Sequence, residues 1–449
     1  MDPLGFLTRH FFTPLYEWKN GIRTGPIKQG LLESQYWSEE QIREMQFEKF
    51  RETVAYAYDK CRYYRRRFDE AGIKPVDLRS TEDIEAVPRL TKDDIRGNLD
   101  DMIAEGHTKD DLIWKRTGGS TGIPVQLYWD EEANTYKECL VFRHNGWAGD
   151  IPGTKRAALW GDVSKKLPFR ARLWDAIFVR TSYLDTLKMD DETIGVFVEE
   201  IRRRSPKIFF GHGHSIYFFS QYLLDHGIDD IKFDGIISSA ETLPPSERKV
   251  VEQVFGNIVY DRYGCEEVSI IASECEAHDG MHIAAEGIFL EMPGADESTP
   301  AELIVTDLVN RGMPLIRYEI GDMATTKSGR CSCGRNLPRL GKVVGRTTDI
   351  LYTPDGTQVS GVSILDTFTI HIPGFRQVQI LQETLGELQF SIVKSDTFSQ
   401  ESENQLASAV SNVFGPNMKF SLNYVDKISR TGRGKFQFSI CKIKPEDIR

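Results

Sequence analysis

The chain has 449 residues, which is long enough for two or three domains and a large buried core. Hydrophobic residues make up 40% and charged residues 27% of it, a composition that excludes disorder, collagen-like repeats and coiled coil. The formal net charge of −11 provides no basic field for nucleic acid or anionic lipid, so we expect no nucleic-acid partner and favour a small molecule.

The first elements along the chain are helical. The segment from Phe6 to Trp18 is aromatic but poor in Lys and Arg, which favours packing against the protein's own body over anchoring at a membrane surface. A capping box of Ser38 and Gln41 then opens a long helix whose apolar residues recur at helical spacing. No signal peptide opens the sequence and no apolar run reaches the ~18 residues of a membrane span, so we expect a cytoplasmic protein.

Between about residues 155 and 345, short β-rich runs alternate with helical ones. The strand-like runs include 207–211, 235–241, 257–264 and 301–307. A helix from Ser246 to Phe255 starts after two prolines and stops at Gly256, so it connects two of these runs in the manner of a crossover. The alternation predicts an α/β fold with a parallel or mixed sheet.

After residue 350 the pattern changes to strands, one helix and further strands. The expected elements are strands at 377–382 and 387–393, a helix at 404–414, and strands at 419–426 and 435–441. This ββαββ order predicts a separate, small α+β domain. We therefore expect a large N-terminal α/β domain over residues 1–345, a hinge at 346–350 and a mobile C-terminal lid over 351–449.

The segment from Arg116 to Pro124 is the most informative one. Its three glycines let backbone amides approach an anion and its three hydroxyls add donors, which suits a polyphosphate, although a flexible hairpin remains the alternative on composition alone. Gly122 is followed by Ile123 rather than Lys, so this is no P-loop. Elsewhere, the dinucleotide fingerprint is incomplete, because Ile216 stands where a third glycine belongs.

Polar clusters follow several predicted strands, at 238–241, 263–267, 321–322 and 345–346. Because ligands of open α/β sheets bind at the carboxyl ends of strands, these clusters indicate a binding site.

Five segments in this order resemble the motifs of the adenylate-forming ligase superfamily, and within it the phenylacetate–coenzyme A ligase group with its capsule polysaccharide biosynthesis relatives. They are 116–124, similar to the ATP phosphate loop; 263–267, similar to Tyr-Gly-x-Ser/Thr-Glu; 317–322, similar to Tyr-Arg-Thr-Gly-Asp; 345–349, similar to Gly-Arg-x-Asp-Asp; and 430–435, similar to the C-terminal Gly-Lys motif.

The resemblance implies ATP as a substrate, Mg²⁺ as its companion ion, and a set of site residues. The nucleotide-binding residues it implies are Thr117, Gly118, Gly119, Ser120, Thr121 and Gly122 around the phosphates, with Ala240, Glu241, Tyr263, Gly264 and Asp322 around the adenine and ribose. Glu267 would hold Mg²⁺, Arg346 would lie near the ribose and phosphates, and Lys435 would reach the α-phosphate and the substrate carboxylate. Taken singly, each would be an ordinary surface or core residue.

The implied activity is ATP-dependent activation of a small carboxylate as an acyl adenylate, with pyrophosphate release and transfer, most simply, to coenzyme A. One alternative passes the acyl group to an amine or hydroxyl, for instance on an amino sugar of a surface polysaccharide. Another is a catalytically silent, zinc-stabilised ATP-binding protein, since Thr348 and Glu266 depart from the family's motifs. The acid is not identified, but segments 160–162 and 211–215 are expected to line its pocket, and a homodimer is left open.

A second group of chemically active residues consists of Cys and His. Three cysteines, Cys275, Cys331 and Cys333, with His282 or His278, provide the four N/S ligands of a structural zinc site. His282 is preferred because relatives of the group carry a Gly-x-His pattern. The alternatives are free thiols, or a disulfide between Cys331 and Cys333 that one intervening residue would strain.

Overall fold

The computed structural model describes residues 2–116, 125–160, 171, 174–346, 350–360, 368, 372–429 and 437–443. Its helices are α1 (Pro3–Leu7), α2 (Thr13–Lys19), α3 (Thr24–Ser34), α4 (Glu39–Lys60), α5 (Arg62–Glu70), α6 (Lys92–Met102), α7 (Glu131–Trp147), α9 (Asp191–Arg204), α10 (Gly213–Asp225), α11 (Pro245–Phe255) and α13 (Gln400–Phe414). Its strands in the first half are β1 (Ile113–Arg116), β2 (Gln126–Trp129), β3 (Arg156–Trp160), β4 (Thr181–Asp185), β5 (Ile208–His212), β6 (Gly235–Ser239), β7 (Val259–Cys265), β8 (Ser269–Glu274) and β9 (Met281–Ile283). The later strands are β10 (Ile288–Glu291), β11 (Ala301–Asp307), β12 (Tyr318–Lys327), β13 (Arg339–Arg346), β14 (Ile350–Tyr352), β15 (Gln358–Ser360), β16 (Phe375–Thr384), β17 (Glu387–Lys394), β18 (Lys419–Tyr424) and β19 (Ser439–Cys441).

One eleven-stranded mixed sheet organises most of the chain, in the order β10-β11-β12-β13-β9-β8-β7-β6-β5-β3-β4. From β4 to β7 the neighbouring strands are parallel, and from β7 to β10 they are antiparallel. As predicted, α11 crosses from β6 to the parallel β7. Every residue of β6 is buried, as expected for a strand covered on both faces. The α/β architecture is confirmed.

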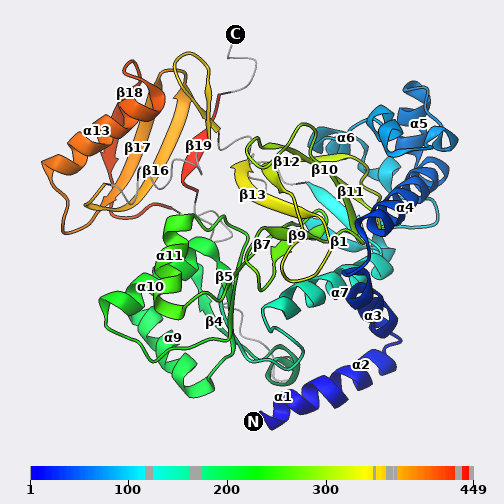
Figure 1. Cartoon of the computed structure of the whole chain (residues 1–449), viewed down its shortest axis with the longest axis horizontal. Helices are drawn as coiled ribbons and strands as arrows, with labels where there is room; N and C mark the ends of the chain where they lie inside the picture. The colour runs from blue at the N-terminus through cyan, green and yellow to red at the C-terminus, as the bar shows by residue number, and fades with distance from the viewer. Residues whose placement is uncertain are drawn as a thin grey trace.

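Two large hydrophobic cores lie between this sheet and the helices that pack against it. Figure 1 shows α9, α10 and α11 gathered against the parallel strands, and α4 to α6 beside β10 to β12. The predicted capping box opens α4, where Ser38 Oγ accepts from the Gln41 amide and the Gln41 side chain accepts from the Ser38 amide. Buried Phe50 and Val54 then point one face of α4 into the core. Among the described residues, no helix is long and apolar enough to cross a bilayer.

The C-terminal residues form the expected ββαββ arrangement. The hairpin of β16 and β17 is followed by α13, β18 and β19, and the four strands lie in the order β18-β17-β16-β19. Phe390, Leu406 and Phe414 belong to a separate hydrophobic core in this part. The strand predicted at 435–441 begins at Ser439, while residues 430–436 lie outside the described residues. The division into domains at 345 and 351 stays a prediction.

The N-terminal helices differ from the expectation that they pack against the body. One face does so: the Thr8 hydroxyl donates to the carbonyl of Ile177 at 2.9 Å, and the Tyr16 ring contacts Trp174, with ring centroids 4.8 Å apart. On the other faces Phe11 is 58% and Trp18 79% exposed. The expectation was wrong for most of the apolar side chains because helical spacing does not reveal whether a tertiary partner exists for each face.

Candidate functional site

The carboxyl ends of β5, β6 and β7 lie side by side at one edge of the sheet, because these three strands are parallel neighbours. Ala240 and Glu241 follow β6 directly, and Tyr263 lies near the end of β7. Ala240 has a positive φ of 67°, so the chain turns sharply there. The turn packs tightly on the start of α10, where a Cβ at Gly213 would lie 3.3 Å from the Glu241 carbonyl oxygen. The predicted adenine-binding residues are therefore brought together.

Asp322, on β12, meets Tyr263 from the antiparallel half of the sheet. The Tyr263 hydroxyl donates a hydrogen bond of 2.6 Å to Asp322 Oδ2. In the pairing of β12 with β13, Asp322 lies opposite Arg346. Three residues predicted from separate motifs thus occupy neighbouring positions of the backbone.

Glu267 is buried just beyond β7, at 6% exposure. The Tyr318 hydroxyl donates to Glu267 Oε1 at 2.9 Å, and the Trp129 indole donates to the Glu267 carbonyl at 3.3 Å. Burial and the charge of Glu267 raise the pKa of Tyr318 far above its ordinary value, so this hydroxyl remains a donor. The carboxylate is thereby fixed in one orientation, and carboxylates are ligands that Mg²⁺ accepts.

Near the carboxyl end of β7, position 264 requires glycine. A Cβ there would lie 2.5 Å from the Ser269 carbonyl oxygen, a contact that no side chain tolerates. Gly264 and Glu266 are both exposed. Glu266, which stands where the family motif has a hydroxyl, therefore lies on the surface beside the buried Glu267.

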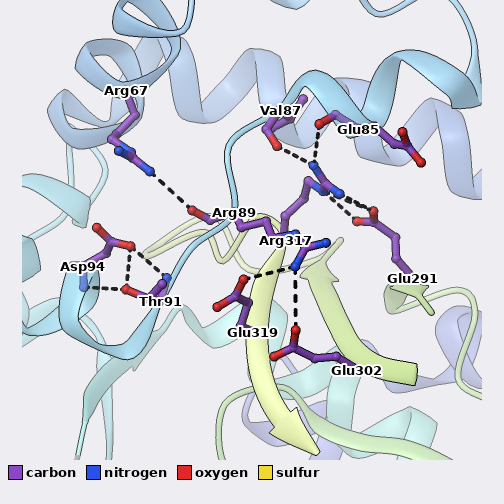
Figure 2. A network of polar contacts seen from close by, with 10 residues as sticks. All are labelled: Arg67, Glu85, Val87, Arg89, Thr91, Asp94, Glu291, Glu302, Arg317 and Glu319. Atoms are coloured by element: carbon purple, nitrogen blue, oxygen red, sulfur yellow. Dashed lines mark hydrogen bonds and ion pairs between the residues drawn. The ribbon is translucent and has the colours of Figure 1, made fainter. Parts of the chain in front are cut away.

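Arg317 anchors the segment before α6 to the sheet, a role that the sequence did not reveal. Its guanidinium donates to both oxygens of Glu291 at 3.0 and 3.1 Å and to the carbonyls of Glu85 and Val87 at 2.9 and 2.6 Å. Figure 2 shows this network, with Arg317 between Glu291 and the two carbonyl groups. Arg317 has a positive φ of 49°, which these hydrogen bonds hold in place. It immediately precedes Tyr318, so the network also positions the donor to Glu267.

A charged surface region adjoins this network. Arg89 lies 3.4 Å from Glu319 and 3.7 Å from Glu302, as Figure 2 shows. A shallow cavity of about 330 Å³ lies beside them, lined by Thr91, Lys92, Asp93, Arg96, Glu302, Glu319 and Gly321. Gly321 connects this cavity to Asp322.

The predicted metal ligands converge. The ligand atoms of Cys275, His282, Cys331 and Cys333 all lie within 4.8 Å of one another. His282 Nδ1 lies 3.2 Å from the Leu337 carbonyl, which accepts its proton and leaves Nε2 as the ligating atom. His278 lies elsewhere, with Nδ1 3.3 Å from Glu274. The cysteines are free thiols, and the set has the composition of a structural zinc site.

Several predicted residues lie outside the part of the chain that the structure describes: Thr117, Gly118, Gly119, Ser120, Thr121, Gly122, Asp162, Thr348 and Lys435. Trp160 and His212 of the predicted acid pocket are in contact, with ring centroids 4.3 Å apart. His214 pairs with Glu247 at 2.7 Å.

Comparisons with known proteins agree with this arrangement. A family model described as the CapK C-terminal domain matches residues 351–442. Protein CapK of Staphylococcus aureus is 24% identical over 420 residues, covering 89% of each chain. The phenylacetate-coenzyme A ligase of Thermus thermophilus is 24% identical over 403 residues, covering 82% of this chain and 85% of the relative. That of Pseudomonas putida is 27% identical over 338 residues, covering 73% and 74%.

The fold is that of solved adenylate-forming enzymes. The structure of 2-hydroxyisobutyryl-CoA ligase in the postadenylation state, in complex with R3-HIB-AMP, has a TM-score of 0.72 at 19% identity and covers 92% of both chains. The same ligase in the thioesterification state gives 0.57 at 20% identity, covering 91% of this chain and 93% of that one. The expected resemblance is thus confirmed: along most of its length the chain is similar to phenylacetate–coenzyme A ligases and to CapK, and its fold is that of an AMP-forming CoA ligase.

Proposed function

We propose that this protein joins a small carboxylate to AMP and then transfers the acyl group to coenzyme A. In the first step a carboxylate oxygen bonds to the α-phosphorus of ATP, and the bond from that phosphorus to pyrophosphate breaks. In the second step a thiolate attacks the acyl carbon and AMP leaves. The observation that carries the proposal is the meeting of Tyr263, Asp322 and Glu267 at the sheet edge, in a chain whose relatives are named as CoA ligases.

Asp322 is proposed to bind the ribose. Its carboxylate can accept a hydrogen bond from each ribose hydroxyl, and the Tyr263 hydroxyl fixes its orientation at 2.6 Å. Ala240 and Glu241 are proposed to flank the adenine, because the turn after β6 places them beside the end of β7. The binding site for the nucleoside would thus be formed from three strands.

Glu267 is proposed as the Mg²⁺ ligand. The residues fit this ion, since Tyr318 orients a buried carboxylate at the edge where the phosphates are expected. Mg²⁺, when bound, would neutralise phosphate charge.

The remaining roles rest on the resemblance alone. The loop from Thr117 to Gly122 would hold the β- and γ-phosphates through backbone amides and hydroxyls. Lys435 would stabilise the negative charge that develops at the α-phosphate, and Arg346, opposite Asp322 in the strand pairing, would contact the ribose or phosphates.

Pyrophosphate release tests the activity. The wild-type protein, ATP and a panel of carboxylates are expected to release pyrophosphate, and coenzyme A is expected to convert the accumulated adenylate to thioester and AMP. Glu267→Gln should lose this release, whereas Glu252→Gln, an acid on α11 away from the edge, should retain it. Release that is accelerated only by amines or alcohols would assign the acceptor to a nitrogen or oxygen nucleophile. Absence of release with ATP bound would identify a silent nucleotide-binding protein.

A structural zinc ion is proposed at Cys275, His282, Cys331 and Cys333. Four N/S ligand atoms within 4.8 Å of one another match the tetrahedral set that zinc prefers. The cluster takes no part in the proposed chemistry, because no predicted nucleotide-binding residue belongs to it.

A further inference from the structure

A row of four side chains crosses the parallel strands at their carboxyl ends. His212 of β5 is paired with Ser239 of β6, and Ser239 is paired with Arg262 of β7. On the other side of β5, Trp160 at the end of β3 contacts His212, with ring centroids 4.3 Å apart. Trp160, His212, Ser239 and Arg262, which we call the end row, therefore lie in sequence along the edge where α/β sheets bind ligands.

Contacts show that the end row shares one face of the sheet. The Trp160 ring stacks on Phe210 at 5.3 Å, and the Arg262 guanidinium lies over the same Phe210 ring, 5.0 Å from its centroid. Arg262 Nε also donates to Ser239 Oγ at 3.2 Å. Trp160, Phe210 and Arg262 are all half-buried, so aromatic rings lie beside a guanidinium at this edge, whereas His212 and Ser239 of the end row are buried.

Arg262 is half-buried, and the described residues provide no carboxylate as its counter-ion. Among the described residues, no carboxylate lies within 4.0 Å of it. Its two hydrogen bonds go to neutral oxygens, Ser239 Oγ and Asn145 Oδ1, the second at 3.0 Å. Since a guanidinium has five N–H donors, three have no acceptor among the described residues. A cation in this state is costly unless an anion completes its pairing.

Asp150, whose charge acts on Arg262, is already paired with another arginine. Asp150 accepts from Arg156 Nε at 2.7 Å and from the Asn145 amide at 3.3 Å. Asn145 thus bridges the two groups, accepting from Arg262 and donating to Asp150. The hydrogen bond to Asn145 holds Arg262 in place, while Arg156 forms the salt bridge with Asp150. Burial lowers the pKa of Arg262 to about 10, so it remains a cation at neutral pH.

Arg262 lies on the opposite face of β7 from the proposed ribose site. Consecutive residues of a strand point to opposite faces, and its neighbour Tyr263 is bonded to Asp322. The group that pairs with Arg262 is therefore not part of the nucleoside. It would belong to the acid, at the end away from the reacting carboxylate.

We infer that the acid activated by this protein carries a second carboxylate at its far end, which Arg262 binds as a salt bridge while Trp160 and Phe210 contact the carbon chain between the two groups. This inference rests on the proposed adenylation. It assigns Arg262 as a specificity-determining residue, because an acid without the second carboxylate would leave the guanidinium unpaired. Sites built around such a polar partner discriminate strongly against analogues that lack it.

Matched pairs of acids test the assignment. The probes are glutarate against valerate, and 4-carboxyphenylacetate against phenylacetate, each assayed for pyrophosphate release. The wild-type protein is expected to favour the diacid of a pair by at least tenfold in kcat/KM. Arg262→Gln should lower the ratio of diacid to monoacid kcat/KM by on the order of 10²-fold, since one partner of a charge pair is removed. Arg262→Lys should retain part of the preference.

Arg202→Gln is the matched control, because Arg202 is a surface arginine on α9 that pairs with Asp230. It should leave the ratio unchanged. Calorimetric titration of each acid into protein saturated with an ATP analogue that cannot release pyrophosphate gives a second readout, in which diacid affinity alone should fall in Arg262→Gln.

The outcomes separate the two proposals. Equal loss for both members of a pair in Arg262→Gln would overturn the inference, because Arg262 would then serve the reacting carboxylate or the fold. A wild-type preference for monoacids would overturn it as well, while leaving adenylation intact. If no acid releases pyrophosphate although ATP binds, adenylation itself fails and the inference fails with it.

Discussion

The hydroxyl of Tyr263 and the carboxylate of Asp322 are joined by a hydrogen bond of 2.6 Å across 59 residues of sequence. The bond connects the parallel half of the sheet to its antiparallel half at the proposed nucleoside site. It also makes Tyr263 a positioning residue as well as an aromatic surface for the adenine.

Replacing Tyr263 by Phe should weaken ATP binding about tenfold. The ring is retained, while the loss of one hydrogen bond to a charged acceptor costs about 1.5 kcal/mol and frees Asp322 to rotate. Calorimetric titration with ATP measures the change. Tyr183→Phe, at a 42% exposed tyrosine on β4, is the control and should bind ATP like the wild type. Unchanged affinity in Tyr263→Phe would show that Asp322 needs no orienting donor.

Lys435→Ala is expected to lower acyl-adenylate formation by on the order of 10²-fold or more, the scale for deleting one donor to a transition state. Thioester formation from synthetic acyl adenylate should be largely spared, because the C-terminal part is expected to rotate Lys435 away between the two steps. Single-turnover assays of each half-reaction measure both effects. Equal losses in the two half-reactions would contradict the rotation.

Protein purified without chelator should contain close to one zinc per chain, measured by elemental analysis. Cys333→Ser should lower the melting temperature, because zinc binding contributes to the free energy of folding, while activity at low temperature should survive. Cys441→Ser removes a free thiol outside the cluster and should leave both zinc content and stability unchanged. Folded wild-type protein with no metal would eliminate the zinc site.

We expect the free energy of unfolding to fall as the pH rises, because Asp261 keeps its proton to a higher pH in the folded protein than in the unfolded chain. Burial and the neighbouring charge of Glu274 raise its pKa from 3.8 to about 7, despite the opposing effects of Arg248 and of hydrogen bonds from Ser238 and the Arg262 amide. Between these two values the folded chain holds a proton that the unfolded chain has released, so the free energy of unfolding falls with increasing pH.

Asp261→Asn should therefore match the wild type near pH 4 and exceed its stability at pH 8 by on the order of 4 kcal/mol, since each pKa unit corresponds to about 1.4 kcal/mol. Urea unfolding at the two pH values measures the difference. Asp234→Asn, at a 62% exposed carboxylate, should show no such pH-dependent gain. A constant difference between Asp261→Asn and wild type at all pH values would rule out titration of Asp261 as the cause.

Local sequence signals predicted much of the fold because the features involved are local. The capping box at Ser38 and the prolines before Ser246 marked helix starts that the structure has within one residue. The resemblance to the family's motifs, rather than any local signal, predicted that Tyr263, Asp322 and Glu267 belong to one site. The structure places these three residues near one another.

Residues whose roles depend on distant partners were missed. Arg317 is held by Glu291, 26 residues away, and by carbonyls about 230 residues away, so nothing near it in the sequence indicates an anchor. Arg262 stands out only in three dimensions, where the described residues place no carboxylate beside it. The exposed ring of Trp18 was misassigned for the same reason, since its environment is set by tertiary packing.

Within the antiparallel half of the large sheet, one pair of neighbouring strands is joined by a very short ladder. β9 and β13 are paired only through His282 with Arg339 and Met281 with Leu340, and the four cysteine and histidine ligands come from both sides of this junction. A ladder of two residue pairs specifies its register weakly, and a slip by one residue would turn His282 to the opposite face. Metal binding would therefore select the correct register during folding, because only that register brings all four ligands together. Refolding in the presence of zinc should consequently raise the yield of native protein and suppress aggregates that form by strand mispairing.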